Sequence, residues 1–393
     1  MDLHALTPVE EISRRIAAVR SLMMEQSVDA LLLTGNANIY YTLGRVISGW
    51  TYIPLEGDPI YFVRRPENIK GDNVCHIHKP ELIPAELSRR GYPLPYRLGL
   101  ELGGATYLAI ERLKAVFPKS DISDASSIMR SARAVKTDFE LQMLRRSGIK
   151  HTMVYSRIPH LYRTGMTDIE LQIEIERVSR LEGCLGQFRI AGDSMELFMA
   201  NVLAGDNADN PTPYDFAMGG AGLDPSIPVG ADGSIIKPGD AVMVDANGNF
   251  TGYMTDMTRV FSCGELKEEA MRAHRCSIDI CRALEKEGVP GAKASELYET
   301  AMHIVTEAGL ERYFMGYTQK AGFIGHGVGI EINELPVIAP RSRDVLKEHN
   351  VIALEPKFVV PGVGAVGIEN TYIVTADGLQ RITDAPEDII NLE

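Results

Sequence analysis

The chain has 393 residues, of which 45% are hydrophobic and 24% charged, and its formal net charge is −13. This composition is typical of a soluble globular protein of two or three domains that buries a core without disulfides. The acidic balance and the lack of Lys/Arg clusters exclude nucleic acid as the main partner. The sequence contains no stretch of about 20 apolar residues, so no membrane span is predicted.

The cysteines indicate a reducing compartment. Their number is odd, their density is low and no CxxC pair occurs, so we expect free thiols in a cytoplasmic protein. The N-terminal sequence MDLHALTPVEEISRR contains acids and no apolar core, so it does not predict a signal peptide. The five cysteines are Cys75, Cys184, Cys263, Cys276 and Cys281.

The first third of the chain alternates between helical and strand patterns. Residues 8–28 place apolar side chains at helical spacing, and residues 106–116 form a second amphipathic helix pattern. Buried strands are predicted within residues 29–43, 59–65 and 96–102. Strands separated by helices predict an α/β domain over residues 1–130.

The rest of the chain predicts helices followed by Gly-rich strands. Thr167 and Glu170 form a capping-box pattern at the start of one helix. Segment 203–240 is rich in Gly, Pro, Asp and Asn and is expected to form loops. We expect residues 131–393 to form a second, α+β domain. Its helices are predicted at residues 138–157, 167–182, 265–288 and 293–309.

The first informative segment, AVMVDANGNFTGYMTDMTRVF, covers residues 241–261 and predicts a hairpin. If Asn249 pairs with Gly252, Asp245 lies directly opposite Asp256, with Cβ atoms about 4.5–5.5 Å apart. Two like charges in that position repel each other unless a cation lies between them. The hairpin therefore predicts a cation site.

A second hairpin and a glycine loop repeat this chemistry. Residues 351–374 have a turn signal at Pro361-Gly362, and Glu355 and Glu369 lie at equal distances on either side of Gly362. His326 lies between two glycines in FIGHGVGIEINELP, where it could add a nitrogen ligand to an oxygen-rich site. The strands around the acids are apolar, and buried acids are rare unless paired or metal-bound.

Each of these residues alone has a more ordinary explanation. A single Asp at a strand end, such as Asp245, is usually a turn or cap residue, and a single His in a glycine loop is usually structural. Four acids and one His on two hairpins and a loop favour metal binding. The predicted ligands are Asp245, Asp256, His326, Glu355 and Glu369.

The same segments resemble a known family. VDANGNFTGYMTDMTRVF, GHGVGIEINELP, LEPKFVVPG and GIENTYIVT resemble the four motifs of the pita-bread metallohydrolases, which include methionine aminopeptidase, Xaa-Pro aminopeptidase, prolidase and creatinase. DALLLTGNANIYYTLG resembles the creatinase-type N-terminal domain, and ARAVKTDFELQMLRRSG resembles the helix that opens the catalytic domain. The resemblance implies a creatinase-like α/β N-terminal domain and an α+β pita-bread C-terminal domain.

The resemblance also implies a dinuclear site. Asp256 and Glu369 would bridge two divalent ions, Asp245 would complete one, and His326 with Glu355 the other. The carboxylate-rich cage favours manganese over cobalt, zinc or iron. Two such ions share and activate a water, and Glu355 would carry its proton.

Three positions depart from the peptidase pattern. Peptidases of this family usually carry a second His seven residues after the ligand His, and Asn333 stands there. Asn can still donate a hydrogen bond to a substrate carbonyl, so we treat it as a candidate catalytic residue. An upstream His is replaced near Pro228, and Gly367 stands where prolidase-like members often have Arg.

We therefore expect a metal-dependent hydrolase of the Xaa-Pro dipeptidase or aminopeptidase type, acting on a small peptide. Creatinase-type members are commonly homodimers, so a homodimer is expected. The missing histidines leave open another reaction on the same cage, such as hydrolysis of a non-peptide C–N bond or a lyase reaction. The remaining alternative is a non-catalytic binding protein.

Overall fold

The computed structural model describes residues 7–192, 195–216 and 218–392. The chain divides into two compact units, of which the first ends at Arg133 and the second begins at Ala134. The boundary expected after residue 130 falls within helix α5 (Ser126–Ala134).

The first unit is an α/β layer structure, as predicted. The apolar face expected for the first helix is buried at Ile16, Val19 and Met23. Its helical elements are α1 (Val9–Glu25), α2 (Asn36–Leu43), η1 (Pro80–Leu82), α3 (Ile83–Arg89), α4 (Tyr107–Val116) and α5. Its strands are β1 (Ala30–Leu33), β2 (Ser48–Pro54), β3 (Ile60–Arg65), β4 (Val74–His76), β5 (Arg97–Leu100) and β6 (Asp121–Asp124). They form a mixed sheet in the order β4-β3-β2-β1-β5-β6, in which β5 runs parallel to β1 and β2 antiparallel to it.

The second unit contains longer helices and mostly antiparallel strands. Its helical elements are α6 (Asp138–Tyr155), η2 (Ile158–His160), α7 (Asp168–Leu181), η3 (Gly205–Asp209), α8 (Glu268–Glu287) and α9 (Ala294–Ala308). The first group of strands is β7 (Ala200–Ala204), β8 (Ala241–Asn249), β9 (Met254–Ser262), β10 (Gly325–Gly327) and β11 (Glu334–Ile338). The second group is β12 (Val351–Leu354), β13 (Lys357–Val360), β14 (Gly364–Gly367), β15 (Asn370–Thr375), β16 (Gly378–Arg381) and β17 (Ile390–Asn391).

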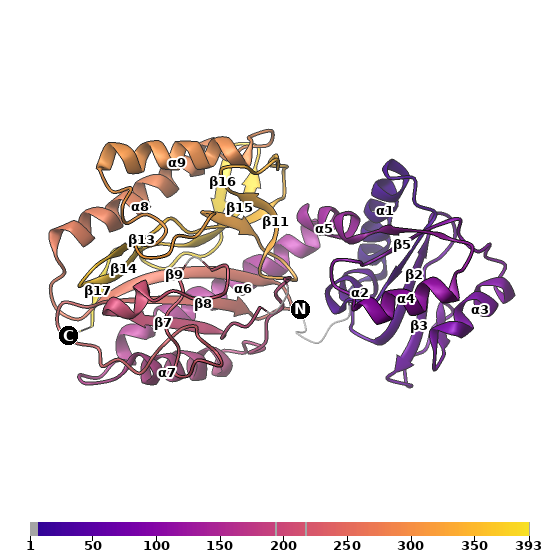
Figure 1. Cartoon of the computed structure of the whole chain (residues 1–393), viewed down its shortest axis with the longest axis horizontal. Helices are drawn as coiled ribbons and strands as arrows, with labels where there is room; N and C mark the ends of the chain where they lie inside the picture. The colour runs from indigo at the N-terminus through magenta and orange to yellow at the C-terminus, as the bar shows by residue number, and fades with distance from the viewer. Residues whose placement is uncertain (1–6, 193–194, 217, 393) are drawn as a thin grey trace. The chain divides into compact units, whose positions relative to one another are not determined.

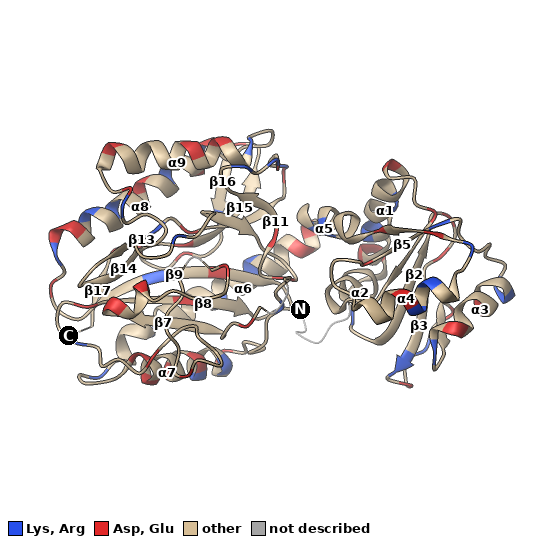
Figure 2. Ribbon diagram, in the orientation of Figure 1, with Lys and Arg blue, Asp and Glu red and all other residues tan. Residues whose placement is uncertain are grey.

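The strands of this unit lie between two helical layers (Figure 1). They form sheets in the orders β11-β10-β12-β15-β16 and β17-β9-β8-β7, with the pair β13-β14 beside them. Helices α8 and α9 cover one side, where α8 packs on β13 and β14, and α6 and α7 cover the other, against β8, β9 and β7. Charged residues concentrate on the helices and are sparse along the central strands (Figure 2).

Side-chain caps define where two of these helices begin. The capping box predicted at Thr167 is present, because Thr167 accepts a hydrogen bond from the Glu170 amide and Glu170 accepts one from the Thr167 amide. Thr137 and Glu140 form a second capping box at α6. Within the part of the chain that the structure describes, the helices are too short or too polar to span a bilayer.

Candidate metal centre

The first predicted pair of acids lies on β8 and β9, but not directly opposite. Asp245 pairs with Thr258, and Asp256 pairs with Asn247. The expected opposition of Asp245 and Asp256 is therefore wrong by two residues, although the alternation of side chains keeps both on one face. The reason is the turn: Asn249 pairs with Met254 instead of Gly252, so the connection is longer than predicted.

The second pair behaves as predicted. The ladder of β12 and β15 pairs Leu354 with Asn370, and the ladder of β13 and β14 pairs Lys357 with Gly367. Both ladders keep the same register, so Glu355 and Glu369 face each other in the break between them. Both carboxylates are buried.

Threonines and an arginine join the two hairpins. Thr258 donates a hydrogen bond to Glu369 Oε2 (2.7 Å), and the Glu369 amide bonds back to the Thr258 carbonyl. The Thr371 hydroxyl accepts from the Asp256 amide and donates to the Asp256 carbonyl, each at 2.8 Å. Buried Arg259 donates to the carbonyls of Thr258 and Glu369. These contacts fix Asp256 and Glu369 relative to each other.

His326 reaches this cluster from β10. Its Nε2 lies 3.4 Å from Glu355 Oε1 and 3.9 Å from Asp256 Oδ2, while Nδ1 lies 3.1 Å from the Gly327 carbonyl. A proton on Nδ1 leaves the Nε2 lone pair facing the carboxylates. A Cβ at Gly325 or Gly327 would lie 2.5 or 2.1 Å from a backbone oxygen, so the flanking glycines permit the close strand packing.

A lysine that the sequence analysis did not single out completes one side of the cluster. Lys357 Nζ lies 2.8 Å from Glu355 Oε2, 2.9 Å from Asp245 Oδ2 and 3.3 Å from Glu369 Oε2. Its side chain is 0% exposed. Burial opposes a charged amine, but these three carboxylates outweigh it and raise the pKa of Lys357 well above its ordinary value.

The other side of the cluster has the chemistry of a cation site. Ligand atoms of Asp256, His326 and Glu369 lie within 4.8 Å of one another. Glu369 Oε1 is buried and has no hydrogen-bond partner among the described residues. Burial and the neighbouring carboxylates raise the pKa of Glu369 to about 8 and that of Asp256 well above its ordinary value. Buried carboxylates of this kind need a proton or a cation, so these residues fit a divalent ion.

A cavity of about 90 Å³ opens beside the cluster, and Asp245, Asp256, His326 and Glu355 reach it. Asn247 also lines it, and both polar atoms of its amide are buried without a hydrogen-bond partner in the described residues. The sequence pattern did not indicate Asn247, because its place opposite Asp256 depends on the register of β8. The apolar wall includes Leu197, Phe198, Met199, Phe216, Phe323 and Ile332.

The positions that depart from the peptidase pattern have structural contacts. Asn333 lines the cavity, but its amide accepts from the Ala191 amide and donates to the Ala191 carbonyl. Gly367 lies opposite Lys357, and its amide donates to His274 Nδ1. The Pro228 carbonyl accepts from Thr212 and lies outside the lining of the cavity.

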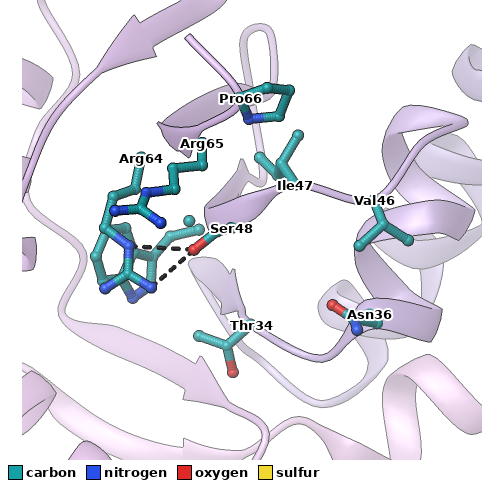
Figure 3. Close-up of a pocket in the computed structure, with 10 residues that line it drawn as sticks. Thr34, Asn36, Val46, Ile47, Ser48, Arg64, Arg65 and Pro66 are labelled. Carbon is teal, nitrogen blue, oxygen red and sulfur yellow. Dashed lines mark hydrogen bonds between the residues drawn. The ribbon is translucent and has the colours of Figure 1, made fainter.

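The first unit contains a larger cavity of about 670 Å³ (Figure 3). Arg64 points into the labelled group and donates to the Ser48 hydroxyl, and Arg65, Thr34 and Asn36 also line the cavity. The described lining contains no carboxylate, histidine or cysteine. This cavity therefore lacks the ligands and bases that the cluster in the second unit provides.

An antiparallel sheet unit that gathers carboxylates and one imidazole, preceded by an α/β unit, is the architecture of a creatinase-type metallohydrolase. Residues 142–376 match the model of metallopeptidase family M24, and residues 15–135 match the creatinase/prolidase N-terminal domain. The chain therefore belongs to metallopeptidase family M24 and is a metallohydrolase, as the resemblance implied.

Relatives and solved structures agree with this assignment. The chain is 24% identical over 382 residues to Xaa-Pro dipeptidase from Pyrococcus horikoshii, covering 96% of this chain and 99% of the relative. It is 28% identical over 291 residues to Xaa-Pro dipeptidase from Lactobacillus delbrueckii subsp. lactis, covering 74% and 71%. The structure of an Xaa-Pro dipeptidase from Bacillus anthracis superposes with a TM-score of 0.80 at 23% identity, covering 97% and 99%. The structural likeness confirms the two-domain fold.

Proposed function

We propose that this chain hydrolyses small Xaa-Pro peptides with a divalent metal held by Asp256, His326, Glu355 and Glu369. The observation that carries the proposal is the buried cluster of these ligands beside a cavity. Xaa-Pro dipeptidases among the relatives support the substrate class. A divalent ion at such a site lowers the pKa of a bound water and polarises a carbonyl.

We assign the proton transfer to Glu355. Burial alone would raise its pKa, but the charge of Lys357 and the hydrogen bond with His326 outweigh burial and lower the pKa to about 2. Glu355 is therefore ionised at neutral pH and accepts a proton at Oε1, the oxygen that faces His326. The proton that Glu355 takes from the attacking water is the one that it passes to the departing amine.

We assign the contact with the substrate amide to Asn247. Asn247 lines the cavity, and its Nδ2 and Oδ1 have no hydrogen-bond partner among the described residues, so we assign it a donor to the scissile carbonyl and an acceptor for a peptide N–H. Asn333 is committed to the Ala191 main chain, so we propose that it positions the loop at the cavity. Asn247 would then supply the hydrogen bonding that the family's missing histidines provide.

The proposal is tested with a panel of Xaa-Pro dipeptides and tripeptides after loading with manganese, cobalt, zinc or iron. Manganese is expected to support the highest activity, because oxygen ligands dominate the site. His326→Ala is the matched inactive control. Absence of turnover in protein shown to contain metal would exclude peptidase activity and favour the C–N hydrolase or lyase alternative, whereas failure to bind metal would favour a binding protein.

We also propose a homodimer in a reducing compartment. The creatinase-type N-terminal domain supports the dimer by resemblance, and the odd number and low density of the cysteines support the compartment. Light scattering coupled to size exclusion is expected to give twice the chain mass of 43.2 kDa. A mass of one chain would contradict the dimer.

A further inference from the structure

We propose that the ammonium group of Lys357 stands in place of one of two metal ions, so that this centre binds a single divalent ion. The cluster has two halves. The lysine half consists of Asp245, Glu355 Oε2 and Glu369 Oε2 around Lys357. The open half consists of Asp256, His326 and Glu369, together with Glu355 Oε1, which lies 3.4 Å from His326 Nε2. The inference rests on the proposed function only in taking the open half to bind metal.

Each of the three N–H donors of the Lys357 ammonium has a carboxylate acceptor. A lysine ammonium has three N–H donors, and Nζ lies within hydrogen-bond distance of one oxygen on each of three carboxylates. A metal ion bound by the same oxygens would need to lie about 2 Å from them, in the space that Nζ occupies. The same group of side chains therefore holds either the ammonium or an ion.

The lysine is fixed in this position by its strand. Its carbonyl accepts a hydrogen bond from the Met315 amide (2.8 Å), and its backbone pairs with Gly367. Its side chain is fully buried. A Cβ at Gly367 would lie 3.0 Å from Lys357 Cα and 2.7 Å from the Pro356 carbonyl oxygen. A glycine at this position therefore lets β14 pack closely against β13, which carries Lys357.

The oxygen atoms of Glu369 divide between the two halves. Oε2 accepts from Lys357 and Thr258, whereas Oε1 is buried without a partner among the described residues. One ion in the open half would satisfy Oε1 and leave the ammonium with its three acceptors. A second divalent ion, in the lysine half, would place two further positive charges beside the buried ammonium. Coulomb repulsion between the ion and the ammonium opposes this.

The experiment measures metal content and metal–metal coupling in the full-length chain. Protein equilibrated with Mn²⁺ and desalted is expected to contain one ion per chain by elemental analysis. Its electron paramagnetic resonance spectrum is expected to show the hyperfine pattern of an isolated Mn²⁺, without the exchange coupling of two ions about 3.5–4 Å apart. Because this readout uses the unaltered chain, it does not depend on a variant folding.

Matched variants separate the two halves. Asp256→Asn is expected to lose the ion, and Asp245→Asn, which can still accept from Lys357, is expected to keep it. Lys357→Ala is expected to bind two ions with a coupled spectrum, and Lys357→Arg, which keeps the charge, is expected to bind one. Circular dichroism identifies any variant that does not fold.

Two coupled ions in the unaltered chain, or loss of the ion on Asp245→Asn with retention on Asp256→Asn, would overturn the inference. Two ions together with dipeptide cleavage would refute the inference and leave the proposed function standing. One isolated ion without cleavage of any Xaa-Pro peptide would refute the proposed function and leave the inference standing. No bound metal and no cleavage would refute both.

Discussion

The two hairpins of the second unit solve the same electrostatic problem in different ways. On β12 to β15, Glu355 and Glu369 face each other, and the chain provides Lys357 between them. On β8 and β9, the two aspartates are offset, and an amide, Asn247, faces Asp256. Opposed like charges destabilise a strand pair, so one hairpin carries an internal cation and the other separates its acids.

This difference has a functional consequence. In the hairpin with the lysine, the ammonium neutralises the facing carboxylates. In the offset hairpin, Asn247 and Asp256 line the cavity, and the Asn247 amide has no hydrogen-bond partner among the described residues. A shift of two residues in register thus decides which side chain faces Asp256.

The largest expected effect is on the hairpin with the internal cation. Lys357→Met removes the ammonium that lies among three carboxylates, and removing one partner of a buried ion pair costs about 3–5 kcal/mol. Urea unfolding of metal-free protein measures this loss. Lys357→Arg is the control, and an unchanged unfolding free energy in Lys357→Met would show that the lysine does not neutralise this hairpin.

The aspartates of the offset hairpin should differ in activity. Asp256→Asn is expected to lower kcat/KM for an Xaa-Pro dipeptide by more than about 100-fold, beyond the loss typical of residues that only orient a ligand. Asp245→Asn is expected to cost less, because Asp245 bonds the lysine. Equal losses would contradict the division of the cluster into two halves.

Asn247→Ala tests the amide that the register places opposite Asp256. If Asn247 donates to the scissile carbonyl, its loss is expected to lower kcat about 100-fold, which is the range seen for one donor to a developing oxyanion. KM should change little, since the contact strengthens in the transition state. Asn333→Ala is the comparison, and a larger loss there than in Asn247→Ala would reverse the two assignments.

The pH dependence of stability tests the buried carboxylate of Glu369. The pKa of Glu369 is raised from 4.5 to about 8 in the folded chain. Between those values the folded state holds a proton that the unfolded state has released, so metal-free protein loses stability as pH rises, by up to about 1.4 kcal/mol per pH unit. Urea titrations in chelator from pH 5 to pH 8 measure the slope, which Glu369→Gln should reduce.

The smallest expected effect concerns the link between the hairpins. Thr371→Val keeps the shape and removes both hydrogen bonds to the Asp256 main chain, leaving that amide without this partner. The expected loss is about 1–3 kcal/mol in unfolding free energy, with weaker metal binding. Thr375→Val, at the far end of β15, serves as the control, and an equal effect there would deny Thr371 a special role.

Much of this architecture could be predicted from local sequence signals. Helical periodicity predicted α1, α8 and α9 within a few residues, and Thr167 with Glu170 marked the start of α7. The strand β2 was missed, because SGWTYIP contains Gly and Pro, which weaken a strand pattern. The family was recognised from its motifs.

The centre was predictable in its residue types but not in its geometry. The turn at Gly362 was predicted correctly, because it depends on local chain conformation. The register of β8 differs from the predicted one because the connection runs from Phe250 to Tyr253, both of which are buried, and is longer than expected. Lys357 was missed because two of the three acids around it, Asp245 and Glu369, come from other parts of the sequence.

On the proposed single-ion centre, where the ion binds the Glu369 oxygen that has no partner among the described residues, the stability of the protein would depend on metal supply. A ligand that binds only the folded state raises the free energy of unfolding with the logarithm of its concentration, by about 2.7 kcal/mol at 100 times Kd. The melting temperature is therefore a property of the chain together with its medium. A cell that runs short of the ion would lose folded protein as well as its activity, since chains without the ion unfold more often and are degraded.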